Sequence, residues 1–246
     1  QEEREKQREE LKRIQSEVIF IRDSLRATAP GNSSYSYVFS DSGKHQKVKI
    51  SIVIKVPKGA KLELNVRFGE IKLAENLKDV KAKLSYSTLW ANREDGQNTL
   101  IESAYAPLNI TRWNEGSLHL KYVTDALIKS VNNIRLHADN SVLSIDDFTG
   151  TGSLESRFGK VIITNHSPFE HLNIFADNSE VTLKLAQQPY QVQIESQNGE
   201  ISYPKEWKLT DEKNTPFFRL ISGYTGKKTE TNRLEIRNTF GRVLIQ

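Results

Sequence analysis

The segment Leu154–Ile163, LESRFGKVII, decides the fold of this chain. An apolar, a polar, a small and a second polar residue precede Phe158, and a glycine and a run rich in β-branched residues follow it. The same order recurs along most of the chain, and we align its copies on the residue that stands where Phe158 stands. These corner residues are Phe68, Tyr86, Tyr105, Tyr122, Asn140, Phe158, Asn178, Asn198 and Phe240. Successive corners are 17 to 20 positions apart, except for a last step of 42, which is close to two periods.

Apolar residues recur at fixed distances from each corner. The position four residues before the corner is apolar in every copy, and the positions three and five residues after it are apolar in almost all copies. Apolar residues at every second position are typical of strands with one buried face. A pair of such strands joined by a bend and repeated about every 20 residues predicts a β-solenoid. We therefore expect an all-β, single-stranded β-solenoid (β-helix) with about 18–20 residues per rung, right-handed because parallel crossovers almost always are.

Two local features of the repeat predict details of the corner. Gly or Ser follows most corner residues, and we expect the glycines to adopt the backbone conformation of the sharp bend. The copy around Tyr122 is the weakest, because Asp125 stands where an apolar residue belongs. We expect a short bulge there, with the alternation restored at Leu127.

Residues 1–16 are dense in helix formers and predict a short exposed α-helix. Leu11 and Ile14 are its only apolar anchors. The heptad spacing continues through Val18, Ile21 and Leu25. A coiled coil, and with it a helix-mediated assembly role, is therefore the alternative.

The rest of the chain divides into two parts. Residues 17–60 predict N-terminal strands and an irregular β cap over the open end of the solenoid, with Lys47–Val56 as the clearest half-buried strand. Residues 61–246 form the solenoid, with an irregular insertion at 204–232 that carries four aromatic residues. The last copy of the repeat, Leu234–Gln246, finishes at the chain end.

Composition restricts the function. The 246 residues include no cysteine, so disulfides, zinc thiolate sites and a cysteine nucleophile are excluded. A net charge of +4 without a basic stripe of interleaved aromatic residues argues against nucleic acid as a partner. No run of 18 apolar residues predicts a transmembrane helix. The chain begins at Gln1 without a visible signal peptide, and we expect a processed or trimmed product.

The candidates for chemistry are few. His119 and His137 occupy the same column in neighbouring rungs, which brings two imidazoles together, but no third ligand is forced nearby and no metal is expected. Asp139 and Asp177 stand in matching Asp-Asn-Ser triplets two rungs apart, about 10 Å by strand spacing, and corner formation explains them better than catalysis. Cofactor motifs such as the P-loop or GxGxxG are missing from the sequence, so we expect no cofactor and no catalytic residue.

Exposed aromatic residues mark a candidate ligand-binding face. Trp90 and Trp113 are expected on the outward side of nearby rungs, with Tyr105 and Tyr122 close by. Together with the two histidines they form a surface that could stack on sugars or bind a partner. Packing of the tryptophans against loops is the alternative.

The repeats resemble the bacterial adhesin β-solenoid family, whose members are exported envelope proteins classed as a domain of unknown function. The resemblance rests on VPKGAKLELNVRFGEIKLAENLKDVKAKLSYSTLWA (Val56–Ala91) and on the later segments SAYAPLNI and ESRFGKVIITN, and it covers roughly Val48–Gln246. It implies a location in the periplasm, on the outer membrane surface or outside the cell. The family offers no established catalytic residues, and the adhesin label is itself an inference.

These observations lead to two hypotheses about function. The first is a non-enzymatic cell-envelope or surface protein, an adhesin or scaffold that binds glycan or an envelope protein through an extended solenoid face. The second is a polysaccharide-active β-helix enzyme that uses surface carboxylates. An enzyme needs acidic groups that converge in a cleft, whereas a scaffold presents flat, solvated ladders of side chains.

Overall fold

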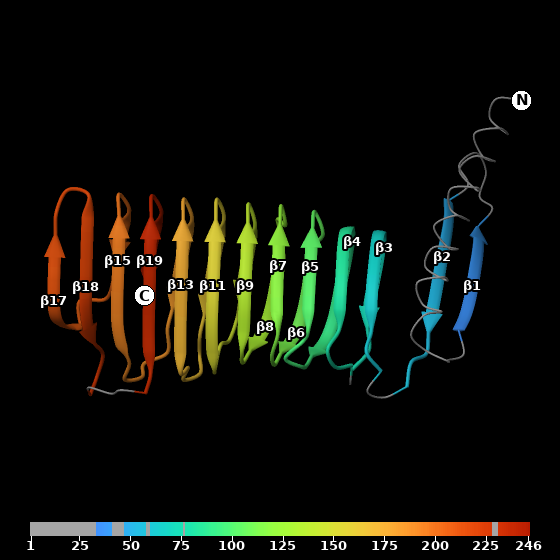
Figure 1. The fold of residues 1–246 in the computed structure, drawn as a ribbon, viewed down its shortest axis with the longest axis horizontal. Helices are drawn as coiled ribbons and strands as arrows, with labels where there is room; N and C mark the ends of the chain where they lie inside the picture. The colour runs from blue at the N-terminus through green and yellow to red at the C-terminus, as the bar shows by residue number, and fades with distance from the viewer. Residues whose placement is uncertain (1–32, 41–46, 58–59, 76, 228–230) are drawn as a thin grey trace, which may run out of the picture. The chain divides into compact units, whose positions relative to one another are not determined.

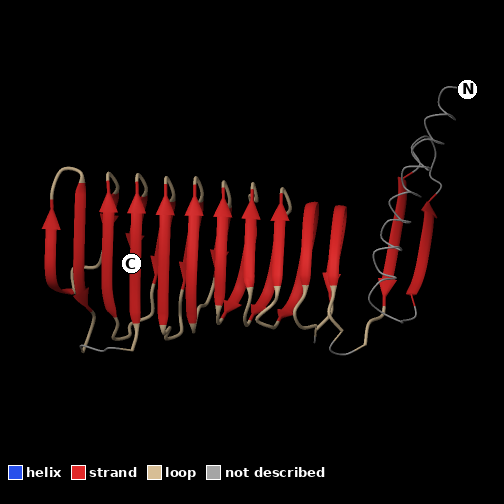
Figure 2. Ribbon diagram, in the orientation of Figure 1, coloured by secondary structure: helices blue, strands red, loops and turns tan. Residues whose placement is uncertain are grey.

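The computed structural model describes residues 33–40, 47–57, 60–75, 77–227 and 231–246. These residues form strands, turns and loops, and none of them is helical (Figure 2). The helix predicted at 1–16 lies outside the described residues. Across the described ranges, therefore, no helix has the length and apolar character to cross a membrane.

Contacts divide the chain into two units, Gln1–Lys61 and Leu62–Gln246. In the first unit, β1 (Ser33–Ser40) and β2 (Lys47–Ile54) pair as antiparallel strands, with Ser33 opposite Ile54. The second strand falls within the segment that the alternating sequence predicts.

The second unit is a β-solenoid, as the repeat predicts. Each rung has one strand segment before its corner residue and one after it. The segments before the corners stack side by side as the first row, those after the corners stack as the second row, and neighbouring rungs pair in parallel within each row. The handedness stays a prediction. The strands are β3 (Glu63–Leu73), β4 (Lys81–Glu94), β5 (Leu100–Ala104), β6 (Leu108–Trp113), β7 (Ser117–Lys121), β8 (Ala126–Val131), β9 (Ile134–Asp139), β10 (Val142–Ile145), β11 (Thr151–Arg157), β12 (Lys160–Thr164), β13 (His171–Asp177), β14 (Glu180–Lys184), β15 (Gln191–Gln197), β16 (Glu200–Ser202), β17 (Lys208–Asn214), β18 (Phe218–Tyr224), β19 (Arg233–Thr239) and β20 (Arg242–Ile245).

The core consists of apolar columns that run through the rungs. Leu136, Leu154 and Ile174 occupy equivalent positions on successive parallel strands, and each is at most 4% exposed. Burial of such columns is the main stabilising term of the fold, because each side chain is removed from water by the rungs on both sides of it.

The rungs do not stack in chain order at the C-terminal end. The last strands, β19 and β20, lie inside the stack: β19 pairs in parallel with β13 on one side and with β15 on the other (Figure 1). Likewise β20 lies between β14 and β16. The last copy of the repeat thus ends at the chain end but lies between two earlier rungs, so strand pairing here does not follow sequence distance.

Within the predicted insertion at 204–232, the strands between Lys208 and Tyr224 supply the end of the first row of strands. They are β18, which pairs antiparallel with β15, and β17, which pairs antiparallel with β18. A hairpin with a register shift between Leu209 and Asp211 thus takes the place of the irregular insertion expected from the sequence. Every residue of β17 is exposed, and its charged side chains suit an edge strand that must avoid further pairing.

The predicted bulge after Tyr122 exists, but its phase differs from the expectation. Leu108 pairs with Ala126, and Ile110 pairs with Ile128, so the inward positions resume at Ala126. Ile128 is completely buried, whereas Leu127 points outward. One extra residue in the bend shifts the alternation, and this shift leaves Leu127 on the outer face.

The insertion of β19 can be tested by cysteine cross-linking, because the chain contains no cysteine of its own. Glu235 pairs with Asn173 on β13 and with Gln193 on β15. Adjacent strands bring Cα atoms within disulfide range. The double variants Asn173→Cys/Glu235→Cys and Gln193→Cys/Glu235→Cys should therefore both oxidise to intramolecular disulfides, measured by mass spectrometry of non-reduced peptides. The control Asn173→Cys/Gln193→Cys should not, and its efficient cross-linking would mean that the rungs stack in chain order.

Candidate functional site

All nine corner residues adopt the left-handed backbone conformation, with φ between 46° and 60°. Asn tolerates this region, but for a bulky side chain it costs roughly 1–2 kcal/mol. The glycines that follow the corners were expected to adopt the special conformation of the bend, and that expectation is wrong for Gly159, Gly199 and Gly241, although Gly69 has a positive φ of 158°. Gly159 and Gly241 instead permit close backbone approach, since a Cβ atom there would lie 2.4 Å from the Ser141 carbonyl oxygen and 2.3 Å from the Ser179 carbonyl oxygen, respectively.

The first four corner side chains form a continuous aromatic stack, which we call the closed half. The ring centroids of Phe68 and Tyr86 are 5.3 Å apart, those of Tyr86 and Tyr105 5.0 Å, and those of Tyr105 and Tyr122 4.9 Å, with interplanar angles of 16° or less. Each inner ring has a neighbour on both faces, so its edge faces solvent. Stacked pairs contribute about 0.5–1.5 kcal/mol each and offset the backbone strain.

The remaining corners form an alternating half. Because β19 and β20 are inserted, the spatial order of these corners is Asn140, Phe158, Asn178, Phe240 and Asn198. In the described part of the chain, ring stacking along the corner ends at Tyr122. Phe158 and Phe240 are each 59% exposed, more than any of the three stacked tyrosines.

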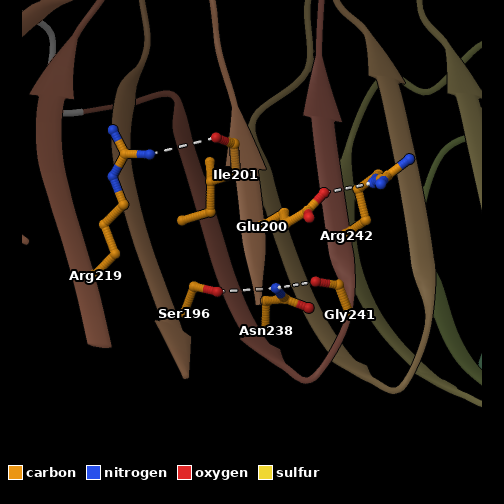
Figure 3. A network of polar contacts seen from close by, with 7 residues as sticks. All are labelled: Ser196, Glu200, Ile201, Arg219, Asn238, Gly241 and Arg242. Carbon is orange, nitrogen blue, oxygen red and sulfur yellow. Dashed lines mark hydrogen bonds and ion pairs between the residues drawn. The ribbon is translucent and has the colours of Figure 1, made fainter. Parts of the chain in front are cut away.

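A shallow groove of about 690 Å³ follows this alternating half. Two ion pairs line it. Lys160 Nζ lies 3.1 Å from Glu180 Oε2. Arg242 Nε lies 2.8 Å from Glu200 Oε2, and Figure 3 shows this second pair. The inserted rung is fixed from within by Asn238, whose side-chain amide donates to Ser196 Oγ at 2.9 Å. The groove therefore combines exposed aromatic rings, amides and balanced charges on a rigid support.

The residues predicted for a ligand face lie on different faces of the solenoid. Tyr105 and Tyr122 belong to the corner stack. Trp90 is 45% exposed but lies on the outer face of the second row, between Lys72 and Asn109. The structure thus brings the two tyrosines together and leaves Trp90 apart from them.

The two histidines lie side by side on the outer face of the first row. His119 pairs with His137, and their ring centroids are 5.6 Å apart. His137 Nδ1 lies 2.8 Å from Glu155 Oε2, and His119 Nδ1 lies 3.9 Å from Glu102 Oε1. Among the described residues, no three His, Asp or Glu side chains converge on a point that could hold a metal ion.

Trp113 is completely buried, so its predicted place on the outward side is wrong. The consecutive residues Thr111 and Arg112 both face solvent, and this second bend returns Trp113 to the interior. It stacks in register with Glu94, which is also completely buried. Neither the Trp113 indole nitrogen nor either Glu94 carboxyl oxygen has a hydrogen-bond partner within the described structure.

Burial raises the pKa of Glu94 from 4.5 to about 8, with a smaller contribution from the neighbouring Asp95 carboxylate. Strongly shifted acids often mark active sites. Here the carboxyl group is enclosed and out of reach of a substrate, so Glu94 weakens the fold at neutral pH and is no catalytic candidate.

Val131 separates Trp113 from an interior aromatic column that the sequence pattern did not reveal. Its ring contacts join Phe148 to Phe169 and Phe169 to Tyr190. These residues follow their corners by 8 to 12 positions, and the variable length of the second bend hides the repeat. A search for buried aromatic residues at a variable distance after each corner could have found it.

The paired carboxylates expected from the sequence lie as far apart as predicted. In strand register, Asp139 and Asp177 lie on opposite sides of Arg157, so one rung separates them, and the Arg157 guanidinium forms its ion pair with Glu155. Asp147 accepts hydrogen bonds from the backbone amides of His166 and Ser167 and holds a loop. Asp147 therefore has a structural role, and a full rung separates Asp139 from Asp177.

The fold and this exposed corner define a β-solenoid repeat protein with an extended aromatic surface. Residues 24–245 match the family described as Toastrack DUF4097, and the chain belongs to that family. No curated protein and no solved structure matches the chain significantly.

The buried Glu94 predicts a pH-dependent stability. Between pH 4.5 and about 8 the unfolded chain has released the proton that the folded protein keeps, so the free energy of unfolding falls as pH rises through this window. Glu94→Gln should remove this slope, on the order of 1.4 kcal/mol per pH unit, and be more stable than wild type at pH 8. Urea unfolding from pH 5 to 8 measures the difference. Glu70→Gln, at an exposed carboxylate, is the control, and equal slopes for wild type and Glu94→Gln would contradict the prediction.

Proposed function

We propose that this protein is a non-enzymatic scaffold or binding protein that holds a glycan or an envelope protein along its corner. The observation that carries the proposal is the row of exposed aromatic side chains at the corner. Six of the nine corner residues are Phe or Tyr, with exposures from 41% to 60%. Contiguous exposed aromatic surface of this kind is typical of interaction sites.

The rigidity of the support favours binding over an extended surface. The backbone amides of corner residues donate hydrogen bonds to the neighbouring rung. The Tyr105 amide donates to the Lys121 carbonyl at 3.0 Å, and the Tyr122 amide donates to the Asp139 carbonyl at 3.0 Å. A preorganised surface loses little conformational entropy when a partner binds.

The arrangement of charges argues for binding in preference to polysaccharide cleavage. Glycoside hydrolysis needs two carboxyl groups on opposite sides of one bond. The carboxylates proposed for that role, Asp139 and Asp177, have Arg157 between them, and the groove carboxylates Glu180 and Glu200 each form an ion pair. These contacts support a surface that recognises polar groups without reacting with them.

We also propose that the protein works in the bacterial envelope, in the periplasm, on the outer membrane surface or outside the cell. The resemblance of its repeats to exported adhesin solenoids supports this location. The lack of cysteine is compatible with an oxidising compartment.

Sedimentation with isolated cell envelopes of the source organism tests the proposed function. The purified protein should co-sediment in a saturable manner and release no soluble sugar during prolonged incubation, measured as reducing ends. Release of reducing ends in proportion to protein, abolished in Asp139→Ala/Asp177→Ala, would instead support the enzyme. The absence of saturable binding would contradict the binding role.

A further inference from the structure

At Phe158 and Phe240, the backbone strain of the corner is not offset by ring stacking. Both adopt the left-handed conformation, with φ of 52° and 54°, yet neither takes part in the ring stacking that offsets this strain in the closed half. Asparagine, which tolerates the conformation, stands at the corners on both sides of each phenylalanine. When a bulky residue keeps a strained backbone conformation and no contact within the protein offsets the strain, a ligand is a reasonable explanation.

The two phenylalanines enclose a slot one ring wide. They stand two rungs apart with Asn178 between them, so about 9.6 Å separates the two corner positions. A ring seated over Asn178 would lie about 4.8 Å from each phenylalanine. This matches the centroid separations of 4.9 and 5.0 Å at which the tyrosines of the closed half pack.

The rim of the slot offers hydrogen-bonding groups of both kinds. The Asn178 side-chain amide donates to Asp177 Oδ1 at 2.9 Å and keeps its oxygen and second hydrogen for other partners. Lys160 and Glu180 lie on one side of this corner, and Arg242 and Glu200 continue the row along the groove. Each cation is already paired with a carboxylate, so the rim favours a neutral ligand.

We propose that this slot, Phe158–Asn178–Phe240, binds a neutral pyranose ring of a glycan, inserted between the two phenylalanine rings. The two C–H faces of the sugar pack on the aromatic faces, and its hydroxyl groups meet the amide and the ion pairs at the rim. Because the ring enters from the corner, the slot selects terminal or branch residues of a glycan. This inference rests on the proposed binding function and assigns its ligand class.

The chemistry of the rim favours a sugar over an aromatic side chain of a partner protein. An aromatic ring would fill the slot equally well, but it would leave the rim donors and acceptors without new partners. Hydroxyl groups both donate and accept, and so match the mixture of amide, ammonium, guanidinium and carboxylate groups.

A second slot continues the pattern at the C-terminal end. The Asn198 backbone amide donates to the Phe217 carbonyl at 2.9 Å. At other corners, the equivalent amide donates to the carbonyl of the residue that precedes the neighbouring corner. Phe217 is 72% exposed and lines a groove of about 640 Å³ that also includes Asn198. Successive slots along one corner would add avidity for branched or multivalent glycans.

Asn178→Phe tests the slot by filling it. The new ring should stack on both neighbours as in the closed half, so the thermal midpoint should equal or exceed that of wild type. An array of neutral glucose, galactose, mannose and N-acetylglucosamine oligosaccharides identifies the bound probe, and calorimetry then measures its Kd. Wild type should bind at least one probe, and Asn178→Phe should weaken that binding at least tenfold. Phe240→Asn removes one wall of the slot without backbone strain, and should weaken the same probe to a similar extent.

Trp90→Ala is the matched control, since it removes an exposed aromatic ring from another face and should leave the Kd unchanged. Failure of wild type to bind any neutral oligosaccharide would overturn the sugar assignment, while envelope sedimentation would still test the proposed function separately. Binding that is lost in Trp90→Ala but kept in Asn178→Phe would place the glycan on the second row and refute the slot. Binding of an envelope protein that Asn178→Phe blocks, without sugar binding, would assign the slot to an aromatic side chain of that protein and refute the sugar assignment.

Discussion

In-register parallel stacking determines most of what this molecule can do. Each residue of a rung lies directly beside the equivalent residue of the next rung, one strand spacing away. A corner side chain is therefore exposed or covered according to the identity of a residue about 20 positions distant. Tyr105 loses both faces to its neighbours, whereas Phe158, with Asn140 and Asn178 beside it, stacks on neither. Surface chemistry along the corner is thus set by pairs of residues and not by single residues.

The inserted rung shows how strongly topology controls these pairs. In chain order, Asn178 and Asn198 would be neighbours, and the corner would present two adjacent amides. Insertion of β19 and β20 places Phe240 between them and extends the alternation of Phe and Asn. The same insertion seats Asn238 between its partners, where its amide donates to Ser196 Oγ and to the Gly241 carbonyl. One non-local pairing thus creates both the interior contact and the spacing of the exposed rings.

The sequence predicts the parts of the structure that depend on strict spacing. Apolar columns and all nine corners follow from a constant distance between equivalent residues, and the structure confirms both. The second bend varies in length, so its interior aromatic column and the burial of Trp113 could not be found by counting. The position of β19 depends on which two rungs it packs between. Neighbouring copies of the repeat have nearly the same apolar pattern, so the pattern does not identify these partners. Local periodicity contains no information on that choice, so the slot between Phe158 and Phe240 could not be predicted either.

The two halves of the corner handle the same backbone strain in different ways. In the closed half, each left-handed aromatic residue regains free energy from the rings stacked on it, within the protein itself. In the alternating half, Phe158 and Phe240 have asparagines on both sides, take part in no ring stacking among the described residues, and are each 59% exposed. A ring that enters from outside over Asn178 would contact one face of Phe158 and one face of Phe240 at once. Ring stacking stabilises the fold in the closed half. In the alternating half, the same kind of stacking would stabilise a bound ligand.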